Sequence, residues 1–331
     1  MKYSIVIPVY NAEKFVLKAL NCLKDQTFKD IEIIIVNDGS SDNSESLVLG
    51  FKKDNPSLDI KYQLNENAGP SNARNTGIEL ATGDYICFLD ADDYYDIHLF
   101  EEIEKMISKD TDILYFGFNE YNEAGERVLL FTDYFKYFDN LSGIEMAKKK
   151  YLKETWLNNC NEIYRLSLIK EKGIRYIEGV YSGEDANFIY KCLMNSKVVK
   201  CLQKEYFYHV CNDQSLFRSE FSEKNVTEFK AIEDTLNYIK ENDIPEIYDY
   251  IYSLYYHTRV TVSKKILTSV KWTQYCKFNK LVKQYIPKVK KPKVLYFNKK
   301  QKFETNLFNF SRLFFFLVVK FYYATHKEQK Q

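Results

Sequence analysis

Short apolar runs alternate with amphipathic stretches over the first third of the chain. Buried strands are predicted at Tyr3–Pro8, Ile31–Val36, Ile60–Leu64 and Tyr85–Leu89. Helices are predicted between them, one capped by Asn11, one starting at Ser41 or Asp42, and one over Pro70–Ala81. The first of these helices has apolar residues at helical spacing, namely Ala12, Phe15, Val16, Ala19, Leu20 and Leu23. Such alternation predicts parallel strands with helices on both faces.

The pattern is mixed beyond residue 110 and becomes helical near residue 225. Strands are predicted at Ile113–Tyr121 and Val198–Leu202, and helices at Ile144–Leu152 and Glu184–Asn195. A later helix places four apolar residues on one face, Phe229, Ile232, Leu236 and Ile239. All 11 glycines lie at or before Gly183, so the remaining residues lack the flexible backbone that usually cradles phosphates.

Charge divides the chain more sharply than its formal net charge of +1 suggests. Residues 250–331 carry 18 Lys and Arg against 2 Glu, whereas residues 1–249 carry 29 against 44 Asp and Glu. Between Tyr250 and Phe303 there is no acidic residue. Such a basic segment is typical of a nucleic-acid or anionic-lipid partner, but no nucleic-acid motif accompanies it, and we expect no nucleic-acid partner.

Composition excludes two other classes of protein. With 331 residues, 45% of them hydrophobic and 28% charged, the chain is neither a small disulfide scaffold nor globally disordered. Its seven cysteines are scattered without a CxxC pair, which indicates a reducing cytoplasm. The apolar opening Ser4–Tyr10 contains Pro8 and no cleavage site, so we interpret it as a core strand. The 28 Tyr and 24 Phe suit sugar-stacking or amphipathic surfaces, although an AT-rich genome also produces them.

Acidic residues follow two of the predicted strands. Asp38 follows the second strand, and Asp90, Asp92 and Asp93 follow the fourth. Parallel strands bind ligands at their carboxyl ends, so these carboxylates should converge and require a cation or a hydrogen-bonding ligand. Helix capping is the alternative, and it would explain Asp93 and Asp42 better than the Asp90-Ala-Asp92 turn.

The residues after the first strand restrict the ligand. The segment Pro8–Glu13 contains no glycine, which excludes the Gly-x-Gly-x-x-Gly turn of a dinucleotide site, and no P-loop occurs. A diphosphate bound without a glycine cradle needs a divalent metal, which an Asp-x-Asp turn can hold.

Four motifs carry a resemblance to a known family. They are Ser4-Ile-Val-Ile-Pro-Val-Tyr-Asn11, Val36-Asn-Asp-Gly-Ser-Ser-Asp42, Asn67-Ala-Gly-Pro-Ser-Asn-Ala-Arg-Asn-Thr-Gly-Ile78 and Phe88-Leu-Asp-Ala-Asp-Asp93. In this order and spacing they resemble the family 2 glycosyltransferases of bacterial surface-polysaccharide synthesis. Gly183-Glu184-Asp185 and the later Tyr206-Phe-Tyr208 resemble that family's catalytic segment and the strand after it. The resemblance covers about residues 3–216 and implies a GT-A fold, that is, a Rossmann-like, mostly parallel sheet with flanking helices.

The resemblance assigns roles to individual residues. It implies that Asp38 accepts the uracil N3–H of UDP, that Asp90 contacts the ribose, and that Asp92 binds Mn²⁺ or Mg²⁺ on the diphosphate. Arg74 would lie beside the phosphates, with an ion pair to Asp93 as the alternative. The base and ribose would be lined by Pro8, Val9 and Tyr10. Two domains are expected. Residues 1–220 form the catalytic domain, with a nucleotide half (1–110) and an acceptor half (111–220), and residues 221–331 form a helical basic region.

Asp185 is the expected catalytic base, because inversion at an anomeric carbon needs one carboxylate to take the acceptor proton. Glu184 would orient the site, and a plain helix start is the alternative for both residues. Toward the acceptor, we expect Trp156, Asn161 and, for the acceptor or the diphosphate, His209. A packed tryptophan and a structural histidine are the alternatives. Glu162 departs from the family, in which Lys is frequent, and places a contact to an anionic acceptor in doubt.

The expected function follows from these assignments. It is inverting transfer of a hexosyl or N-acetylhexosaminyl group from a UDP-sugar to a glycan hydroxyl, on a lipid-linked intermediate of capsule, O-antigen or exopolysaccharide. Alternatives are a protein or teichoic-acid acceptor, or a silent sugar-nucleotide-binding subunit. The apolar run Leu313–Val319, between Arg312 and Lys320, is too short to span a bilayer but can lie in its interface. We therefore expect a cytoplasmic protein bound peripherally to the inner membrane face; a packed helix with solvated lysines is the alternative.

Overall fold

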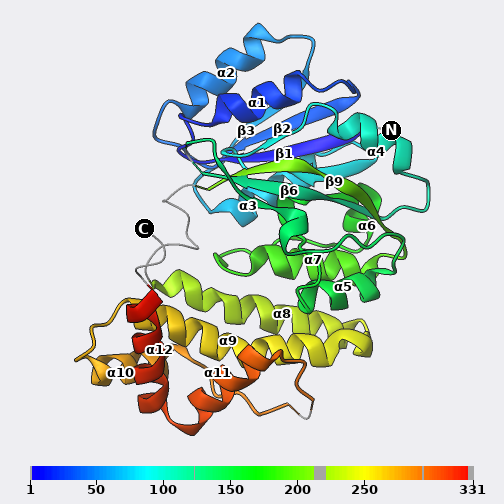
Figure 1. Cartoon of the computed structure of the whole chain (residues 1–331). Helices are drawn as coiled ribbons and strands as arrows, with labels where there is room; N and C mark the ends of the chain where they lie inside the picture. Colours follow the sequence, from blue (N-terminus) through cyan, green and yellow to red (C-terminus); the bar gives the residue numbers. More distant parts are fainter. Residues whose placement is uncertain (1, 123, 212–220, 293, 327–331) are drawn as a thin grey trace. The chain divides into compact units, whose positions relative to one another are not determined.

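The computed structural model of the chain forms two compact units (Figure 1). The first comprises Met1–Gly179 with Glu184–Asp213, and the second comprises Val180–Gly183 with Gln214–Gln331. The structure describes residues 2–122, 124–211, 221–292 and 294–326.

The first unit is built on one mixed sheet with the strand order β3-β2-β1-β4-β8-β6-β9-β5, and β7 pairs with β6. The strands β1 (Tyr3–Val9), β2 (Ile31–Asn37), β3 (Asp59–Leu64) and β4 (Tyr85–Phe88) are parallel, as the sequence predicts. Antiparallel pairing then joins β4 to β8 and β8 to β6, whereas β9 runs parallel to β6. The remaining strands are β5 (Tyr94–Tyr95), β6 (Ile113–Tyr121), β7 (Arg127–Leu130), β8 (Glu162–Arg165) and β9 (Val199–Val210).

Helices cover both faces of this sheet (Figure 1). On one face, Tyr3 of β1 packs against Phe100 of α4, with ring centroids 5.2 Å apart. On the other, a Cβ at Gly77 of α3 would lie 2.2 Å from Val6 of β1, so only glycine allows this close approach. The helices are α1 (Val16–Lys24), α2 (Ser44–Asp54), α3 (Pro70–Leu80), α4 (Leu99–Met106), α5 (Gly143–Tyr151), α6 (Leu166–Glu171) and α7 (Glu184–Asn195).

The predicted cap of the first helix is wrong. Asn11 adopts a left-handed conformation with φ of 49°, and its side-chain oxygen accepts a hydrogen bond from the Ser41 N–H at 2.8 Å. Its side chain thereby joins the loops after β1 and β2, and α1 begins only at Val16. The second helix also starts later than predicted, at Ser44, where Asp42 accepts from the Ser44 N–H at 3.0 Å.

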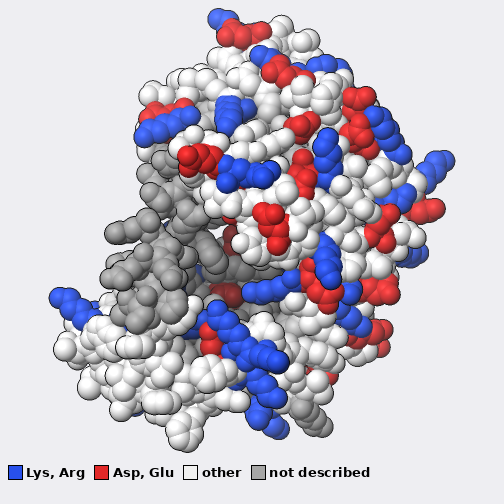
Figure 2. All heavy atoms as spheres, viewed as in Figure 1, with Lys and Arg blue, Asp and Glu red and all other residues white. Residues whose placement is uncertain are grey.

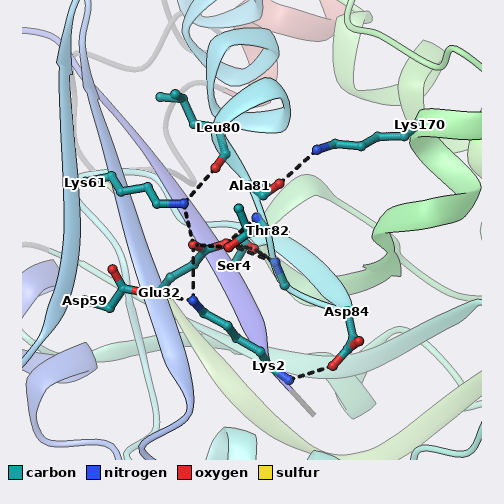
Figure 3. Close-up of polar contacts among 11 residues, drawn as sticks. Lys2, Ser4, Glu32, Asp59, Lys61, Leu80, Ala81, Thr82, Asp84 and Lys170 are labelled. Carbon is teal, nitrogen blue, oxygen red and sulfur yellow. Dashed lines mark hydrogen bonds and ion pairs between the residues drawn. The ribbon is translucent and has the colours of Figure 1, made fainter.

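A buried carboxylate joins the amino-terminal ends of the strands (Figure 3). Glu32 of β2 is 0% exposed, and its side chain accepts hydrogen bonds from Ser4, Thr82, Gly83 and Lys61, the last at 2.7 Å. Burial alone would raise the pKa of Glu32, but the hydrogen bonds from Lys61, Ser4 and Thr82 lower it to about 2. The charged form is therefore the one that stabilises this end of the sheet.

We expect Glu32→Gln to destabilise the first unit by about 3 kcal/mol at neutral pH. Because the folded-state pKa lies below the unfolded value, this contribution is present above pH ~4.5 and is lost as the pH falls toward 2. Urea unfolding at pH 7 and pH 3, monitored by hydrogen exchange in β1 and β2, measures this loss of stability. Glu66→Gln, at an exposed position, is the control, and an equal loss at both pH values would contradict the electrostatic origin.

The second unit is helical. Its helices are α8 (Thr227–Glu241), α9 (Tyr248–Thr268), α10 (Tyr275–Tyr285), α11 (Lys299–Phe310) and α12 (Arg312–His326). The predicted apolar face of α8 is confirmed, since Phe229, Ile232, Leu236 and Ile239 are buried. The helix α9 contacts each of the other four, so it forms the core of the unit. Within the described part of the chain, no helix is both long and apolar enough to cross a membrane.

Candidate active site

The loops after β1 and β2 meet at the carboxyl edge of the sheet. The Asp38 N–H donates to the Val9 carbonyl at 2.8 Å, which holds the two loops together. The Asp38 carboxylate is 3% exposed and accepts hydrogen bonds from the backbone N–H groups of Ala68 (3.0 Å) and Gly69 (2.8 Å). It thereby fixes the turn that leads into α3, while Tyr10, 53% exposed, lies open to solvent.

Arg74 connects the acidic turn after β4 to the start of α7. This residue of α3 is 5% exposed, and its guanidinium donates to Asp90 at 2.9 Å and to Asp185 at 3.4 Å. The ring of Tyr176 lies 5.4 Å from the guanidinium carbon. The alternative, an ion pair between Arg74 and Asp93, is thus wrong: Arg74 pairs with Asp90 and Asp185, and Asp93 pairs with His209. Three segments far apart in sequence meet at this one cation.

The carboxylate of Asp185 is held from two sides. In addition to Arg74, the side-chain amide of Asn159 donates to Asp185, and Asn159 in turn accepts from the Tyr176 hydroxyl at 2.9 Å. The Asp185 side chain remains 43% exposed, so it is fixed in orientation but accessible. Burial raises its pKa, Arg74 opposes the rise, and Asp90 adds to it. Burial and the neighbouring Asp185 raise the pKa of Glu184 to about 7.

The backbone explains why α7 can begin at this position. Gly183, just before Glu184, has φ of +83°, a left-handed conformation that side chains rarely adopt. The two acidic residues then occupy the first turn of α7, where negative charge is favoured by the helix dipole. The position of Glu184 and Asp185 is therefore compatible with both interpretations, a helix start and a catalytic site.

Asp93 and His209 form a separate pair. Asp93 is 2% exposed, lies 3.1 Å from Nδ1 of His209, and accepts from the Val210 N–H at 2.9 Å. Burial lowers the pKa of His209, but the Asp93 carboxylate outweighs it and raises the pKa to about 9. Burial also raises the pKa of Asp93 to about 7, which the His209 hydrogen bond opposes, and the pair ties β9 to the acidic turn.

The acidic turn offers oxygen donors to a divalent cation. Donor atoms of Asp90, Asp93 and Cys160 lie within 4.8 Å of one another, and Asp92 beside them is half-buried. Burial raises the pKa of the Cys160 thiol well above its ordinary value, so the carboxylates are the effective donors. Carboxylate oxygens suit Mg²⁺ and Mn²⁺, and only one oxygen of Asp90 is used by Arg74. Asp93 is held by His209 and Val210, so Asp90 and the neighbouring Asp92 are the carboxylates that suit such an ion.

The residues expected at the acceptor lie in different environments. Trp156 is 41% exposed and packs against Phe135 with ring centroids 5.5 Å apart, so it is neither a core residue nor fully open. Asn161 is 0% exposed and donates to the carbonyls of Phe116 (2.8 Å) and Trp156 (3.1 Å). This placement gives Asn161 a structural role and not an acceptor contact.

Glu162 points into the interior of the sheet unit. Its side chain is 0% exposed and accepts from the Tyr164 hydroxyl, and burial raises its pKa to about 8. No acceptor can reach it there. The residues that sequence reasoning missed are Asn159 and Tyr176, which position Asp185. Their only sequence signal is that Asn159 stands two residues before the Asn161 motif, and no spacing rule connects it to residue 185.

The sheet unit thus gathers two acidic turns, a buried arginine and an accessible carboxylate at one edge. The sequence model described as glycosyl transferase family 2 matches residues 4–172. The chain therefore belongs to glycosyl transferase family 2.

Individual relatives agree with this assignment. The chain is 32% identical over 218 residues to the uncharacterized glycosyltransferase EpsJ of Bacillus subtilis, covering 64% of this chain and 62% of EpsJ. It is 27% identical over 214 residues to the poly(ribitol-phosphate) beta-N-acetylglucosaminyltransferase TarS of Staphylococcus aureus, covering 63% of this chain and 35% of TarS. The chain thus spans less than two thirds of the length of these curated relatives.

Solved structures confirm the predicted GT-A fold. Residues 1–349 of S. aureus TarS in complex with UDP-GlcNAc superpose with a TM-score of 0.71 at 21% identity, covering 98% of this chain and 92% of that chain. A mannosyltransferase from Pyrobaculum calidifontis in complex with GDP-Man and Mn²⁺ gives a TM-score of 0.55 at 12% identity, covering 100% and 88%. At these identities the likeness concerns the fold alone.

Proposed function

We propose that the protein is an inverting glycosyltransferase that moves a hexosyl or N-acetylhexosaminyl group from a UDP-sugar to a hydroxyl of a glycan acceptor. The observation that carries the proposal is the bridge from Asp90 through Arg74 to Asp185, which places an accessible, oriented carboxylate beside the acidic turn. TarS, a family relative, has been solved with UDP and with UDP-GlcNAc, which supports a UDP-sugar donor.

The nucleotide would bind at the edge formed by the β1 and β2 loops. A carboxylate offers about four lone-pair sites, and the Asp38 oxygens accept one backbone hydrogen bond each from Ala68 and Gly69, so Asp38 retains acceptor capacity for the uracil N3–H. The exposed ring of Tyr10 would pack against the base, with Pro8 and Val9 below it. Asp90 would contact the ribose while Arg74 neutralises it.

A divalent cation, Mn²⁺ or Mg²⁺, would be held by Asp92 with help from Asp90. When bound, it supplies charge stabilisation to the departing diphosphate. The chain's own contribution is the guanidinium of Arg74, which lies at the same turn and places positive charge beside the phosphates. His209, which pairs with Asp93, would add positive charge at the same turn when its imidazole is protonated.

Asp185 would act as the base. It takes the proton of the acceptor hydroxyl, whose oxygen forms a new bond to the anomeric carbon as the bond from that carbon to the UDP oxygen breaks and UDP leaves with the electron pair. Attack from the face opposite UDP inverts the configuration. Asn159 and Arg74 orient the carboxylate, Glu184 contributes to the charge of the site, and the exposed part of Trp156 would stack on an acceptor sugar.

The acceptor we propose is a lipid-linked glycan of surface-polysaccharide synthesis, and a teichoic acid is the second candidate. The second candidate is favoured by two relatives, named as poly(ribitol-phosphate) transferases. The silent-subunit alternative leaves the Arg74–Asp185 contact without a purpose, because a binding protein needs no oriented base.

We also propose that the protein attaches to the inner face of the cytoplasmic membrane. The 18 Lys and Arg of residues 250–331 would be attracted to anionic headgroups, whereas the net negative residues 1–249 would be repelled. This attraction is electrostatic, so added salt should weaken the attachment.

We expect purified protein to hydrolyse a UDP-sugar slowly without acceptor, and to bind UDP more than about 10-fold more tightly with Mn²⁺ or Mg²⁺ than after chelation. Asp92→Ala should abolish the metal effect because it removes the expected ligand. Calorimetry with UDP and a panel of UDP-sugars measures both. Asp110→Ala, at an exposed turn, is the matched control, and equal UDP affinity with and without metal would rule out the role of Asp92.

A further inference from the structure

The exposed side of α12 is apolar along the part of the helix whose side chains are described. Phe315, Phe316 and Val319 pack inward and are at most 8% exposed. Lys320 is the only charged residue between 313 and 322, and its ammonium donates to the Val270 carbonyl. The outward side carries large apolar residues that are 44 to 66% exposed, namely Leu313, Phe314, Leu317, Phe321 and Tyr322.

These outward residues form one stripe. Leu313, Leu317 and Phe321 are four residues apart, so they lie along one side of the helix, and Phe314 is beside them. Phe310, 85% exposed at the end of α11, lies just before α12. A helix on the surface of a soluble protein normally turns charged residues outward. Where Figure 1 places the lower part of α12, below the grey atoms of Figure 2, the visible surface is mostly white, that is, without charged side chains.

A groove adjoins the stripe within the same unit. It lies among α9, α11 and α12 and has a volume of about 390 Å³. Three charged residues line it, Lys264, Lys300 and Glu304; Lys264 is paired with Glu304 at 2.9 Å, while Lys300 is exposed. Its walls are mainly apolar and come from Phe303, Leu307, Val318, Val319 and Tyr322. An apolar slot with a cation on its lining suits a ligand that combines a hydrocarbon chain with a negative group.

Charge identifies the occupant. The first turn of α11 carries Lys299, Lys300 and Lys302, all exposed, and residues 250–303 contain 14 Lys and Arg without an acid. A second copy of the chain would bring the same basic segment against this one, and like charges facing each other are unfavourable. An acidic protein would match the lysines but not the stripe of bulky apolar side chains. An anionic bilayer matches both, because its headgroups meet the lysines and its acyl chains meet the stripe.

We propose that the outward face of α12 docks in the interface of an anionic bilayer, with one acyl chain entering the groove among α9, α11 and α12. The helix lies in the membrane plane, the stripe among the upper acyl chains, and the lysines of α11 at the headgroups. This inference rests on the proposed membrane attachment and specifies it, adding an apolar contribution that salt does not screen.

The test uses the full chain and flotation on vesicles of phosphatidylglycerol with phosphatidylcholine, at 0.1 M and 0.5 M salt. Leu317→Gln with Phe321→Gln should reduce binding about 10²-fold at both salt concentrations, since each removes a buried apolar contact worth about 10-fold or more. Lys299→Gln with Lys300→Gln and Lys302→Gln should reduce binding about 10²-fold at 0.1 M salt, about fivefold per lysine, and less at 0.5 M. The matched control is Leu49→Gln with Val128→Gln, at exposed apolar positions of the first unit.

The groove is tested separately with dihexanoyl phosphatidylglycerol below its micelle concentration. Wild type should bind it by calorimetry, and Val318→Trp, which narrows the groove, should weaken binding at least 10-fold with unchanged circular dichroism. Binding equal to wild type in the Val318 variant would overturn the acyl-chain site.

The remaining outcomes separate this inference from the proposed function. If the stripe variant floats like wild type at both salt concentrations, the apolar docking is wrong and the electrostatic attachment stands. If the stripe variant instead turns a dimer into a monomer in sedimentation, the occupant is a second copy and the inference is overturned. If wild type ignores anionic vesicles, attachment and docking both fail. UDP-sugar hydrolysis, measured on the same samples, decides the transferase proposal independently.

Discussion

Asp185→Asn should lose roughly 10²–10⁴-fold in the rate of sugar transfer while UDP affinity stays nearly unchanged. The amide can still accept a hydrogen bond from Arg74 and from Asn159, so the local geometry is retained. It cannot take the proton of the acceptor hydroxyl. The loss should therefore fall on kcat, with a small effect on the KM of the donor. Initial rates with a saturating UDP-sugar, together with calorimetry for UDP, measure the two effects.

Two comparisons make this result specific to a base. Glu184→Gln should lose far less, because Glu184 tunes the charge of the site without taking the proton. Asp110→Asn, at an exposed turn, should lose nothing. If Asp185→Asn keeps more than about a tenth of the activity, the base lies elsewhere. NMR of the product should show inverted anomeric configuration, and retention would refute the single-base mechanism whatever the variants do.

The sequence predicted the nucleotide half of the sheet unit well because its strands are short, buried and separated by turn signals. Four parallel strands and the acidic residues at their ends follow from apolar runs that terminate in Asn, Asp or Gly. The strand order in the second half of the sheet could not be predicted from the sequence. The strand β8 pairs with both β4 and β6, and β9 extends to Val210, because tertiary pairing extended strands whose sequence is partly polar.

The partners within the site were less predictable than its members. Asp38, Asp90 and Asp185 stand out because acids follow a strand or open a helix, which is a local signal. That Arg74 bridges Asp90 and Asp185, while Asp93 takes His209, depends on how α3, α7 and β9 pack together. The predicted helix cap at Asn11 was wrong for a similar reason. The Asn11 side chain accepts a hydrogen bond from the Ser41 N–H in the next loop and does not cap the helix. Long-range hydrogen bonds of this kind have no spacing in sequence.

Packing also decides which experiments on the second unit are informative. From the basic composition of residues 250–331 alone, truncation near Tyr250 would be the natural test of membrane attachment. The structure shows that α9 forms the core of this unit, so that truncation would expose the apolar face of α8. Point substitutions on exposed positions of α11 and α12 avoid the problem, because they leave the buried residues of α12 in place.

Arg74→Met should have the second-largest effect, roughly a 10²-fold loss of transfer, and it should move the pH dependence. The guanidinium is buried, and its loss leaves Asp90 and Asp185 without their shared cation. Since the Arg74 charge holds down the pKa of Asp185 against burial, removing it raises that pKa. The base works deprotonated, so the acidic limb of the pH–rate profile should shift to higher pH.

The cost in folding should be about 1–3 kcal/mol, less than for breaking a fully buried ion pair, because the two carboxylates are 40% and 43% exposed and water can solvate them once the arginine is gone. Arg74→Lys should restore part of the rate because it keeps a positive charge. Recovery should be incomplete, because one ammonium cannot bridge both carboxylates as a planar guanidinium does. Arg175→Met, which removes a surface ion pair to Glu79, should change neither rate nor profile. A loss of rate in Arg74→Met with an unshifted pH profile would mean that Arg74 acts on the donor alone, and the link between the acidic turn and the base would then have to be abandoned.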